Sequence, residues 1–579
     1  MAVNIPGLIS VIVFYMLILG IGILAAKKAV QSTTADVLVA GRNMGLIVSF
    51  FTMTATIVGG AYINGTAEIM ASSGIVWTQG PIGYCIAFFI GGNVYAPRMR
   101  RAGYVTLFDP FQLKLGDRIG ALMCIPQFLG DLFWTAAVLA ALGSTVSIIL
   151  DIDETISIIS SACIAIFYTL LGGLWSVAYT DVVQLLCIAV GLLVSVPFAM
   201  THPSVDFSRI ESTWQGTVET TGIGSFIDIY GILLLGGIPW QVYFQRVLAC
   251  KTPERARLAS TVASAACFLF AIPAVLMGAT GAAADWSQTA YNGTIPIPAD
   301  KMSYILPLVL QYLCPLPVAI IGMGAIAAAV MSSADSIILS TASVFSKNIY
   351  LQMFRPTASD KETIWVVRIA VICAGALACL IAIGAETVYG LYVMCSDLMY
   401  VILFPQFTCV LFIEVTNGYG CLVGYFISVT LRILGGEPLI GLPVFLKFPF
   451  YSEKHGQNFP FRTLTVILSF IAIICVSKLT DFVFTEKYIS QKWDKLGCSD
   501  PEYRKRLQKR EAETQQQELM AARDKRETAK QQQELMEARF KQETARQQQE
   551  LMEARALKEN HAADPLPLDD SNEMLSSHL

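Results

Sequence analysis

Two stretches decide the fold of this 579-residue chain: Val58-Gly-Gly-Ala61 and Leu235-Gly-Gly-Ile-Pro239. Each one interrupts a long apolar run. Glycine weakens the interior of a helix, and Pro239 lacks the backbone N–H that a helix needs, so we expect both helices to unwind at Gly59-Gly60 and at Gly236-Gly237. An unwound turn frees backbone carbonyls that can hold a small cation. The alternative is that these glycines only allow neighbouring helices to pack closely.

The runs around these breaks have the composition of a membrane protein. The sequence is 54% hydrophobic and 15% charged, whereas soluble domains carry about 25% charged residues. Apolar runs of about 20 residues recur along the chain, and each is long enough to cross a bilayer. We therefore predict an all-α polytopic membrane protein with about thirteen transmembrane helices. Their expected ranges are about 7–26, 46–70, 78–97, 120–150, 155–174, 179–201, 223–248, 257–284, 303–347, 364–384, 388–413, 419–434 and 461–484. The ninth range is too long for one straight crossing and should tilt, break or include a surface helix.

Basic residues predict the orientation of these helices. Lysine and arginine gather after the first, third, seventh and ninth expected helices, as in Arg98–Arg101, and are sparse in the alternate loops. The positive-inside rule then places the amino terminus outside and the carboxyl terminus in the cytoplasm. Asn292-Gly-Thr falls in an outside loop and is a candidate glycosylation acceptor. The first apolar run has no basic stretch before it, which favours a retained helix over a signal peptide.

The carboxyl-terminal part differs from the membrane part. We assign residues 1–484 to a transmembrane domain and 485–579 to a cytoplasmic tail. Within the tail, residues 509–556 hold three 16-residue units that each contain the sequence QQQELM. Their Glu, Lys, Arg, Gln and Ala content predicts helices. The tail helix is either a solvated helix or a surface for a cytoplasmic partner.

The two glycine breaks also predict an internal repeat. Each break lies in the first helix of a set of five, over about 46–201 and about 223–413. Secondary transporters place substrate and ion sites near the membrane midplane, where such discontinuous helices meet. A nucleotide-binding loop is not found in the sequence, nor is a nucleophile with a supporting base, and the composition shows no basic face for nucleic acid. We therefore expect a transporter, with no enzyme activity and no cofactor.

Hydroxyl and carboxylate side chains mark a possible ion site. Met331-Ser-Ser-Ala-Asp-Ser336 places the adjacent hydroxyls of Ser332 and Ser333 inside the ninth expected helix. Two hydroxyls and the carbonyls of an unwound helix suit sodium, although such hydroxyls often only bond to the preceding turn of their own helix. Asp335 and Asp131 are costly at membrane depth, so both are candidates for a functional role. Asp181, Asp228 and Asp397 belong to the same class unless they lie at the ends of helices.

Aromatic residues near the breaks predict a site for an organic cation. Trp134 lies in the fourth expected helix, Tyr84 in the third, and Trp240 and Tyr243 follow the second break. Aromatic faces attract cations, and cages of them bind quaternary ammonium groups with about 2 kcal/mol for each desolvated contact. Each ring alone could instead belong to an interfacial belt.

Several stretches carry a family resemblance. They are Phe51-Thr-Met-Thr-Ala-Thr, Gly59-Gly-Ala-Tyr-Ile-Asn-Gly-Thr-Ala-Glu68, Gly237-Ile-Pro-Trp-Gln241, Tyr243-Phe-Gln-Arg-Val-Leu248 and Val330-Met-Ser-Ser-Ala-Asp-Ser336. On these residues the chain resembles the choline-transporting branch of the sodium/solute symporter family, over nearly everything from residue 7 to about 484. The resemblance implies inverted five-helix repeats of the leucine-transporter type. It also implies sodium-coupled, chloride-dependent uptake of choline across the plasma membrane, with a presynaptic location where choline feeds acetylcholine synthesis.

The resemblance further implies residue roles. The sodium ligands carried over by position are Ala55, Val58, Ala329, Ser332 and Ser333.

The choline contacts carried over in the same way are Tyr84, Trp134 and Trp240. This branch has a tryptophan where the present chain has Ile57, so one wall of the expected cage is aliphatic. Ile57 favours a second reading, a sodium symporter for another organic solute. A third reading is a sensor or scaffold without transport that acts through its tail.

Overall fold

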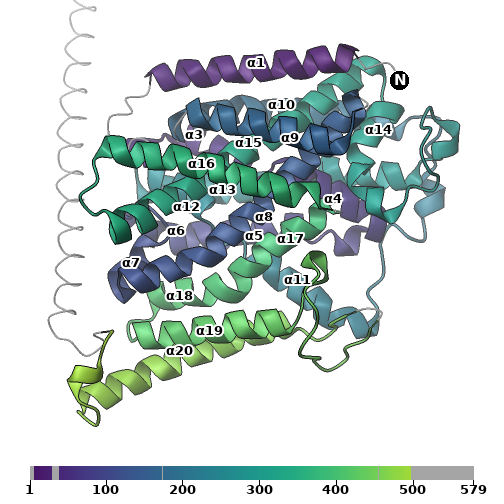
Figure 1. Ribbon diagram of the computed structural model, residues 1–579. Coiled ribbons are helices and arrows are strands. Elements are labelled where there is room, and N and C mark those ends of the chain that lie inside the picture. Colours follow the sequence, from purple (N-terminus) through teal and green to yellow (C-terminus); the bar gives the residue numbers. More distant parts are fainter. Residues whose placement is uncertain are drawn as a thin grey trace, which may run out of the picture. The chain divides into compact units, whose positions relative to one another are not determined.

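The computed structural model describes residues 5–28, 38–150, 152–171, 174–385, 387–453 and 456–496. The chain divides into two compact units, Met1–Arg510 and Glu511–Leu579, and every described residue belongs to the first. The predicted repeats at 509–556 therefore lie outside the described residues. The described residues form helices and isolated bridges such as Met44 with Cys250, and no β-strand (Figure 1).

The helices of the first half are α1 (Ile5–Lys28), α3 (Leu46–Ile57), α4 (Gly60–Ser73), α5 (Gly80–Ile90), α6 (Ala96–Arg101), α7 (Asp109–Leu115), α8 (Asp117–Leu150), α9 (Glu154–Leu171) and α10 (Leu174–Met200). Those of the second half are α11 (Ile223–Leu235), α12 (Gln241–Ala249), α13 (Pro253–Ala283), α14 (Ile305–Leu313), α15 (Leu316–Val344), α16 (Asp360–Ile383), α17 (Val388–Leu398), α18 (Phe404–Phe412), α19 (Gly418–Leu434) and α20 (Phe461–Thr485). Wider turns of helix at Gly91–Tyr95 and Met399–Leu403 join α5 to α6 and α17 to α18.

The described part of the chain contains 8 helices that are long and apolar enough to cross a membrane, and the bent pair α3 and α4 makes one more. These helices differ in how they meet their surroundings. Most of Val388–Phe412 is buried, whereas α20 exposes apolar side chains such as Ile471 and Leu479. An apolar exposed face suits contact with lipid. The structure thus confirms an all-α, multi-pass membrane protein.

Both glycine stretches lie at helix ends. α3 ends at Ile57 and α4 begins at Gly60, with an angle of 47° between them. The N–H of Gly59 bonds to the carbonyl of Ile57, 2.7 Å away, and not to the carbonyl of Ala55 that a continuing helix would use. In the second half, α11 ends at Leu235 and α12 begins at Gln241. The ninth predicted span also breaks, because the segment around Pro315 separates α14 from α15.

Close packing against other helices explains why glycine is needed at these breaks. A Cβ on Gly59 would lie 1.5 Å from Ser333 Oγ, and one on Gly60 would lie 2.1 Å from Val330 Cγ2. In the second break, a Cβ on Gly236 would lie 2.3 Å from the carbonyl oxygen of Ser396. The sequence offered two explanations for these glycines, helix unwinding and close helix packing. Both apply, because the chain unwinds and packs tightly at the same residues.

Candidate cation and substrate site

The first candidate site lies where the α3–α4 break meets α15. Ser333 donates a hydrogen bond to the carbonyl of Thr56 at 3.1 Å, and the carbonyl oxygen of Ala329 lies 3.2 Å from the Cβ position of Gly59. Ala55 and Val58 are fully buried on the other side of this contact. The break and α15 therefore bring Ser333 and Ala329 against residues 56–59, and the other residues that the resemblance assigned to sodium, Ala55, Val58 and Ser332, are chain neighbours of this contact.

The chemistry of this arrangement suits a hard monovalent cation. Ser332 donates its hydrogen to Asp181 Oδ1 at 2.5 Å, as Ser333 does to Thr56. With both hydrogens engaged, each hydroxyl presents its oxygen lone pairs. The Gly59 N–H bonds elsewhere, which leaves the Ala55 carbonyl without its helical partner. Oxygen ligands of this kind are what sodium prefers over softer nitrogen or sulfur ligands.

A buried group of charges adjoins the serines. Asp181 also accepts a hydrogen bond from Thr52, and Arg246 Nη2 lies 3.8 Å from Asp181 Oδ2. Arg246 donates to Ser336 Oγ at 2.6 Å. Asp335 is fully buried, and its carboxylate has no hydrogen-bond partner among the described residues. Asp181 thus has a guanidinium partner, whereas Asp335 is a buried carboxyl group without one in the described part of the chain, and such a costly group inside the membrane part is a candidate for a functional role.

The second candidate site is a group of four rings, Tyr84, Trp134, Trp240 and Tyr392, which we call the aromatic cluster. The centroids of Trp134 and Trp240 are 4.5 Å apart with an angle of 77° between the rings. Tyr84 and Trp134 are 6.0 Å apart at 81°, and Tyr392 lies 5.3 Å from Tyr84 and 6.0 Å from Trp134. Rings that pack edge to face turn their aromatic faces in different directions, and cages that bind quaternary ammonium groups are built from such faces.

The elements of both halves build this cluster. Tyr84 comes from α5, Trp134 from α8 and Tyr392 from α17, and Trp240 occupies the extended residue that precedes α12. Trp240 can point into the core because its backbone has left the helical path, with φ −102° and ψ 123°. The structure thus brings together three of the four rings that the sequence singled out, Tyr84, Trp134 and Trp240. Their side chains are all buried.

Two predicted residues lie elsewhere. Tyr243 stacks on Phe88 with centroids 4.8 Å apart and donates to Ser260, so it belongs to a separate stack. Asp131 accepts hydrogen bonds from Gln127 and Thr341 at 2.6 and 2.7 Å, and its carboxylate thereby links α8 to α15.

Ile57 is buried at the last residue of α3, directly before the break. Asn292 is exposed in the loop that follows α13.

Sequence reasoning missed Arg246 and Tyr392. Arg246 lies near the end of the seventh expected range, 223–248, where it can be counted with the basic residues of the next loop, yet it is fully buried. Its signal in the sequence would have been its position only 6 residues after Trp240, which leaves it inside the membrane part. Tyr392 lies in an apolar stretch with two other tyrosines nearby, and nothing local marks it.

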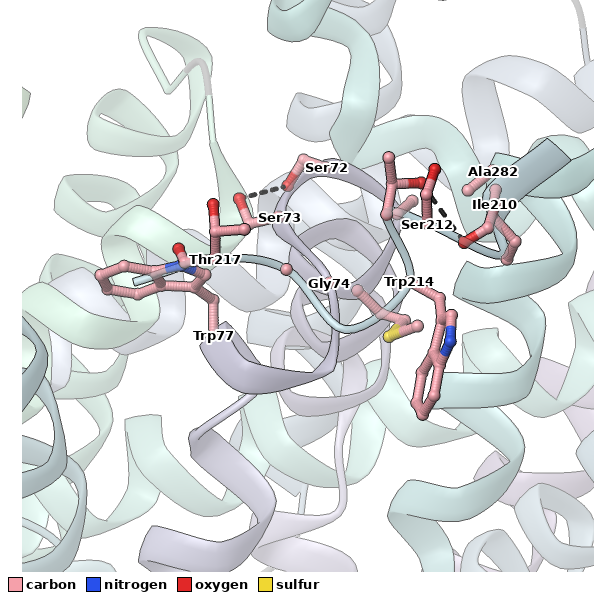
Figure 2. A pocket seen from close by; sticks show the side chains of 13 residues that line it. Ser72, Ser73, Gly74, Trp77, Ile210, Ser212, Trp214, Thr217 and Ala282 are labelled. Carbon is pink, nitrogen blue, oxygen red and sulfur yellow. Dashed lines mark hydrogen bonds between the residues drawn. The ribbon is translucent and has the colours of Figure 1, made fainter. Parts of the chain in front are cut away.

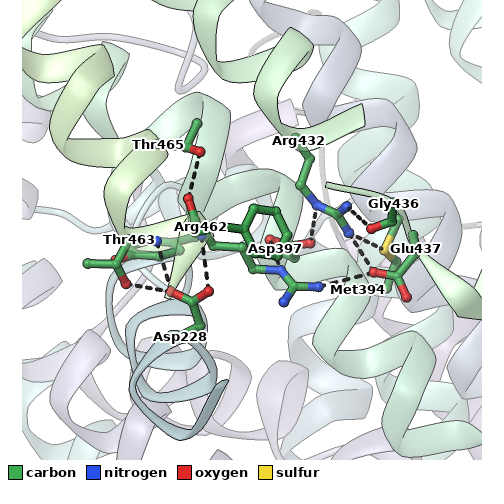
Figure 3. Close-up of polar contacts among 11 residues, drawn as sticks. Asp228, Met394, Asp397, Arg432, Gly436, Glu437, Arg462, Thr463 and Thr465 are labelled. Atoms are coloured by element: carbon green, nitrogen blue, oxygen red, sulfur yellow. Dashed lines mark hydrogen bonds and ion pairs between the residues drawn. The ribbon is translucent and has the colours of Figure 1, made fainter. Parts of the chain in front are cut away.

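A largely buried ion-pair network holds α17, the helix that carries Tyr392 (Figure 3). Figure 3 shows Asp397 of α17 between the guanidinium groups of Arg432 and Arg462, and the closest distances to its carboxylate are 2.6 and 3.2 Å. Asp228 of α11 accepts the backbone N–H groups of Arg462 and Thr463, at 3.0 and 2.9 Å. The network therefore ties α17 and α11, which lead to Tyr392 and Trp240, to α19 and α20.

A separate cavity of about 380 Å³ lies at the carboxyl end of α4 (Figure 2). Trp77 and Trp214 line it, and backbone hydrogen bonds of 2.9 and 3.0 Å join Ile75 and Val76 to Trp214 and Gln215. It contains none of the predicted site residues. We therefore assign the candidate site to the break and the aromatic cluster, and not to this cavity.

Comparison with known proteins gives the chain a family. Residues 37–428 match the model of the sodium:solute symporter family. The human high affinity choline transporter 1 is 49% identical over 512 residues, which cover 85% of this chain and 88% of that protein. The Drosophila melanogaster high-affinity choline transporter 1 is also 49% identical, over 86% of this chain and 82% of that protein.

A solved structure supports the fold. The substrate-bound, outward-open structure of a sodium-coupled sialic acid symporter superposes with a TM-score of 0.67 at 18% identity, over 82% of this chain and 98% of that chain. The relatives are named transporters, so the chain is not an enzyme, and sodium is a transported ion rather than a cofactor. The match covers more than half of the sequence, and we conclude that the chain belongs to the sodium:solute symporter family.

Proposed function

We propose that this protein is a sodium-coupled symporter that carries choline into the cell. The observation that carries the proposal is the meeting of Tyr84, Trp134 and Trp240 in one buried cluster, with rings at 77° and 81°. Choline is a quaternary ammonium ion that cannot donate a hydrogen bond from its cationic centre, so aromatic faces are the natural receptor for it. The 49% identity to the human and Drosophila choline transporters supports the same substrate.

In the proposed mechanism, sodium is bound by Ser332, Ser333 and backbone carbonyls at the α3–α4 break. One bound ion stiffens the contact between α4 and α15, and the break can change its angle when the ion leaves. Alternating access follows if the two proposed repeats, 46–201 and 223–413, move against each other around the breaks. Inward movement of each positive charge across about 100 mV contributes about 2.3 kcal/mol.

The proposal includes a topology. Thirteen transmembrane helices would place the amino terminus outside and the tail, 485–579, in the cytoplasm of the plasma membrane. The exposure of Asn292 supports a glycan at that position. Chloride dependence, a presynaptic location and a cytoplasmic partner of the tail belong to the same proposal.

A second candidate is symport of a different organic solute. The observation that favours it is Ile57, which is buried where the choline branch has a tryptophan. A solute without a quaternary ammonium group would need fewer aromatic walls. A third candidate, a scaffold acting through its tail, predicts that truncation at Ser499 removes the function, whereas both symport proposals predict that uptake survives.

The deciding experiment measures uptake of labelled choline into cells that express the chain, first in sodium and then in N-methyl-D-glucamine. Saturable, sodium-dependent uptake supports the proposal. Absence of uptake, with the protein detected at the cell surface, would reject choline and favour another solute or the scaffold.

A further inference from the structure

The aromatic cluster contains polar groups that the binding of a quaternary ammonium does not use. The hydroxyl of Tyr392 is buried and has no hydrogen-bond partner among the described residues. The Nε1 of Trp240 is also buried and has no hydrogen-bond partner among the described residues. A buried polar group without a partner is rare and costs about 1–3 kcal/mol, so each such group calls for an explanation.

The hydroxyls of the neighbouring tyrosines, by contrast, have hydrogen-bond partners. Tyr84 shares a hydrogen bond of 2.5 Å with Ser396, and Tyr62 donates to the carbonyl of Cys267 at 2.8 Å. Tyr389, one helical turn before Tyr392, donates to the carbonyl of Trp77 at 3.2 Å. Among these packed rings, only Tyr392 has a hydroxyl without a well-formed hydrogen bond to a described residue, although it lies close enough to the Tyr84 hydroxyl to interact with it.

A second polar side chain without a described partner lies at the end of α5 that Tyr392 contacts. A Cβ built on Gly80 would lie 3.3 Å from the Tyr392 hydroxyl, which places the hydroxyl over the amino end of α5. Gln79, the residue before Gly80, is fully buried, and neither its amide nitrogen nor its amide oxygen has a partner among the described residues. The amino end of α5 thus carries a hydroxyl and an amide whose hydrogen-bonding capacity is unused.

Aromatic faces alone cannot distinguish choline from other trimethylammonium ions. Aromatic faces interact with the positive charge and with its methyl groups, which all such ions share. The alcohol of choline is its one additional feature, and it both donates and accepts hydrogen bonds. A site that offers a buried partner to a substrate hydroxyl discriminates against an analogue that lacks this group, because the partner is then left unpaired.

We propose that the Tyr392 hydroxyl, at the amino end of α5, binds the alcohol of the transported amine and that Tyr392 is the residue that selects 2-hydroxyethyl over plain alkyl trimethylammonium ions. This inference rests on the proposed function and goes beyond it, because it assigns the recognition of the substrate's uncharged end. The ammonium group would lie among Tyr84, Trp134 and Trp240. The Tyr392 hydroxyl would form a hydrogen bond with the alcohol of the substrate.

The test compares binding of two probes to purified full-length protein in saturating sodium. Unlabelled choline and n-propyltrimethylammonium, in which a methyl group replaces the alcohol, each compete with labelled choline. We expect Tyr392→Phe to reduce the preference for choline by about three- to tenfold, through weaker choline binding and unchanged analogue binding. The matched control is Tyr62→Phe, whose hydroxyl is already bonded and whose removal should leave the preference unchanged.

The outcomes separate the inference from the proposed function. A wild-type protein that does not bind labelled choline would reject the proposed function before any variant is compared. A wild-type protein that binds choline without preference over the analogue would overturn the inference alone. An unchanged preference in Tyr392→Phe would also overturn it, as would complete loss of both ligands, because the latter would mean that the hydroxyl maintains packing and does not read the alcohol.

Discussion

Ser333 lies in the space that a side chain on Gly59 would occupy: its Oγ is 1.5 Å from the Cβ position of that glycine and 3.1 Å from the carbonyl of Thr56. The unwound turn and the hydroxyl are therefore one structural unit. Ser333 can reach the carbonyls of α3 only because residue 59 has no side chain. We therefore expect substitution of either Gly59 or Ser333 to weaken the binding of sodium.

Gly59→Ala tests this relationship directly. The new methyl group would collide with Ser333 Oγ and Cβ and would approach the carbonyl of Ala329, so the hydroxyl must move away from the break. We expect uptake to require at least about tenfold more sodium, or to be lost. The matched control is Gly20→Ala in α1, where a Cβ meets nothing within 4 Å and uptake should be unchanged. Equal behaviour of the two variants would remove Gly59 from the site.

Replacement of the two hydroxyls tests the proposed ion ligands one at a time. Ser332→Ala and Ser333→Ala each delete an oxygen ligand for a cation, a loss of about 1.5–3 kcal/mol, and should raise the half-saturating sodium concentration by roughly ten- to hundredfold. The readout is uptake of choline as a function of sodium concentration. Ser195→Ala serves as the control, because this buried hydroxyl bonds back to Gly191 of its own helix. Unchanged sodium dependence in both variants would reject the assigned ligands.

The sequence predicted the breaks and the serines because their signals are local. Gly59, Gly60 and Pro239 alter the backbone wherever they occur, and Ser332-Ser333 is legible as a pair of adjacent hydroxyls. The bundle of apolar helices follows from the length of the runs.

The rest of the site depends on contacts between distant segments. Arg246 becomes a fully buried partner of Asp181 only through the packing of α12 against α3 and α15. Tyr392 joins Tyr84 and Trp134 across 250 or more residues of sequence. Helical periodicity does not encode such distant pairs, and a single sequence offers no other means to find them.

Asp397→Asn tests whether the ion-pair network positions the aromatic cluster. The variant removes the negative charge between the buried Arg432 and the partly buried Arg462, which both keep Glu437 as a partner, and we expect a stability loss of about 1.5–3 kcal/mol. The measurement is the thermal unfolding of the purified protein, with choline affinity as the second readout. The control pair is exposed: Asp285 lies 2.7 Å from Arg209 in surface loops, and Asp285→Asn should shift the unfolding temperature far less. A similar shift in both variants would contradict a positioning role.

Substitutions of Trp240 test whether its indole ring binds the ammonium group or only fills space. Trp240→Phe keeps an aromatic face beside Trp134, whereas Trp240→Ala removes it. If the ring binds the ammonium group, alanine should weaken choline binding by about ten- to thirtyfold and phenylalanine by clearly less. Competition with labelled choline measures both variants. Equal losses would indicate that the indole only fills space.

Ile57→Trp decides between the choline and the other-solute proposals. Ile57 is buried next to the break, and a tryptophan there would add an aromatic wall at the end of α3. One added cation–π contact of about 1.5–2 kcal/mol predicts choline binding about ten- to thirtyfold tighter, measured as a lower half-saturating concentration for uptake. The gain requires that the space around residue 57 accepts an indole. If the neighbours have instead repacked around isoleucine, the larger ring forces them apart and uptake falls, because overpacking a buried site costs about 1–3 kcal/mol. Such a loss would favour a solute recognised without that wall.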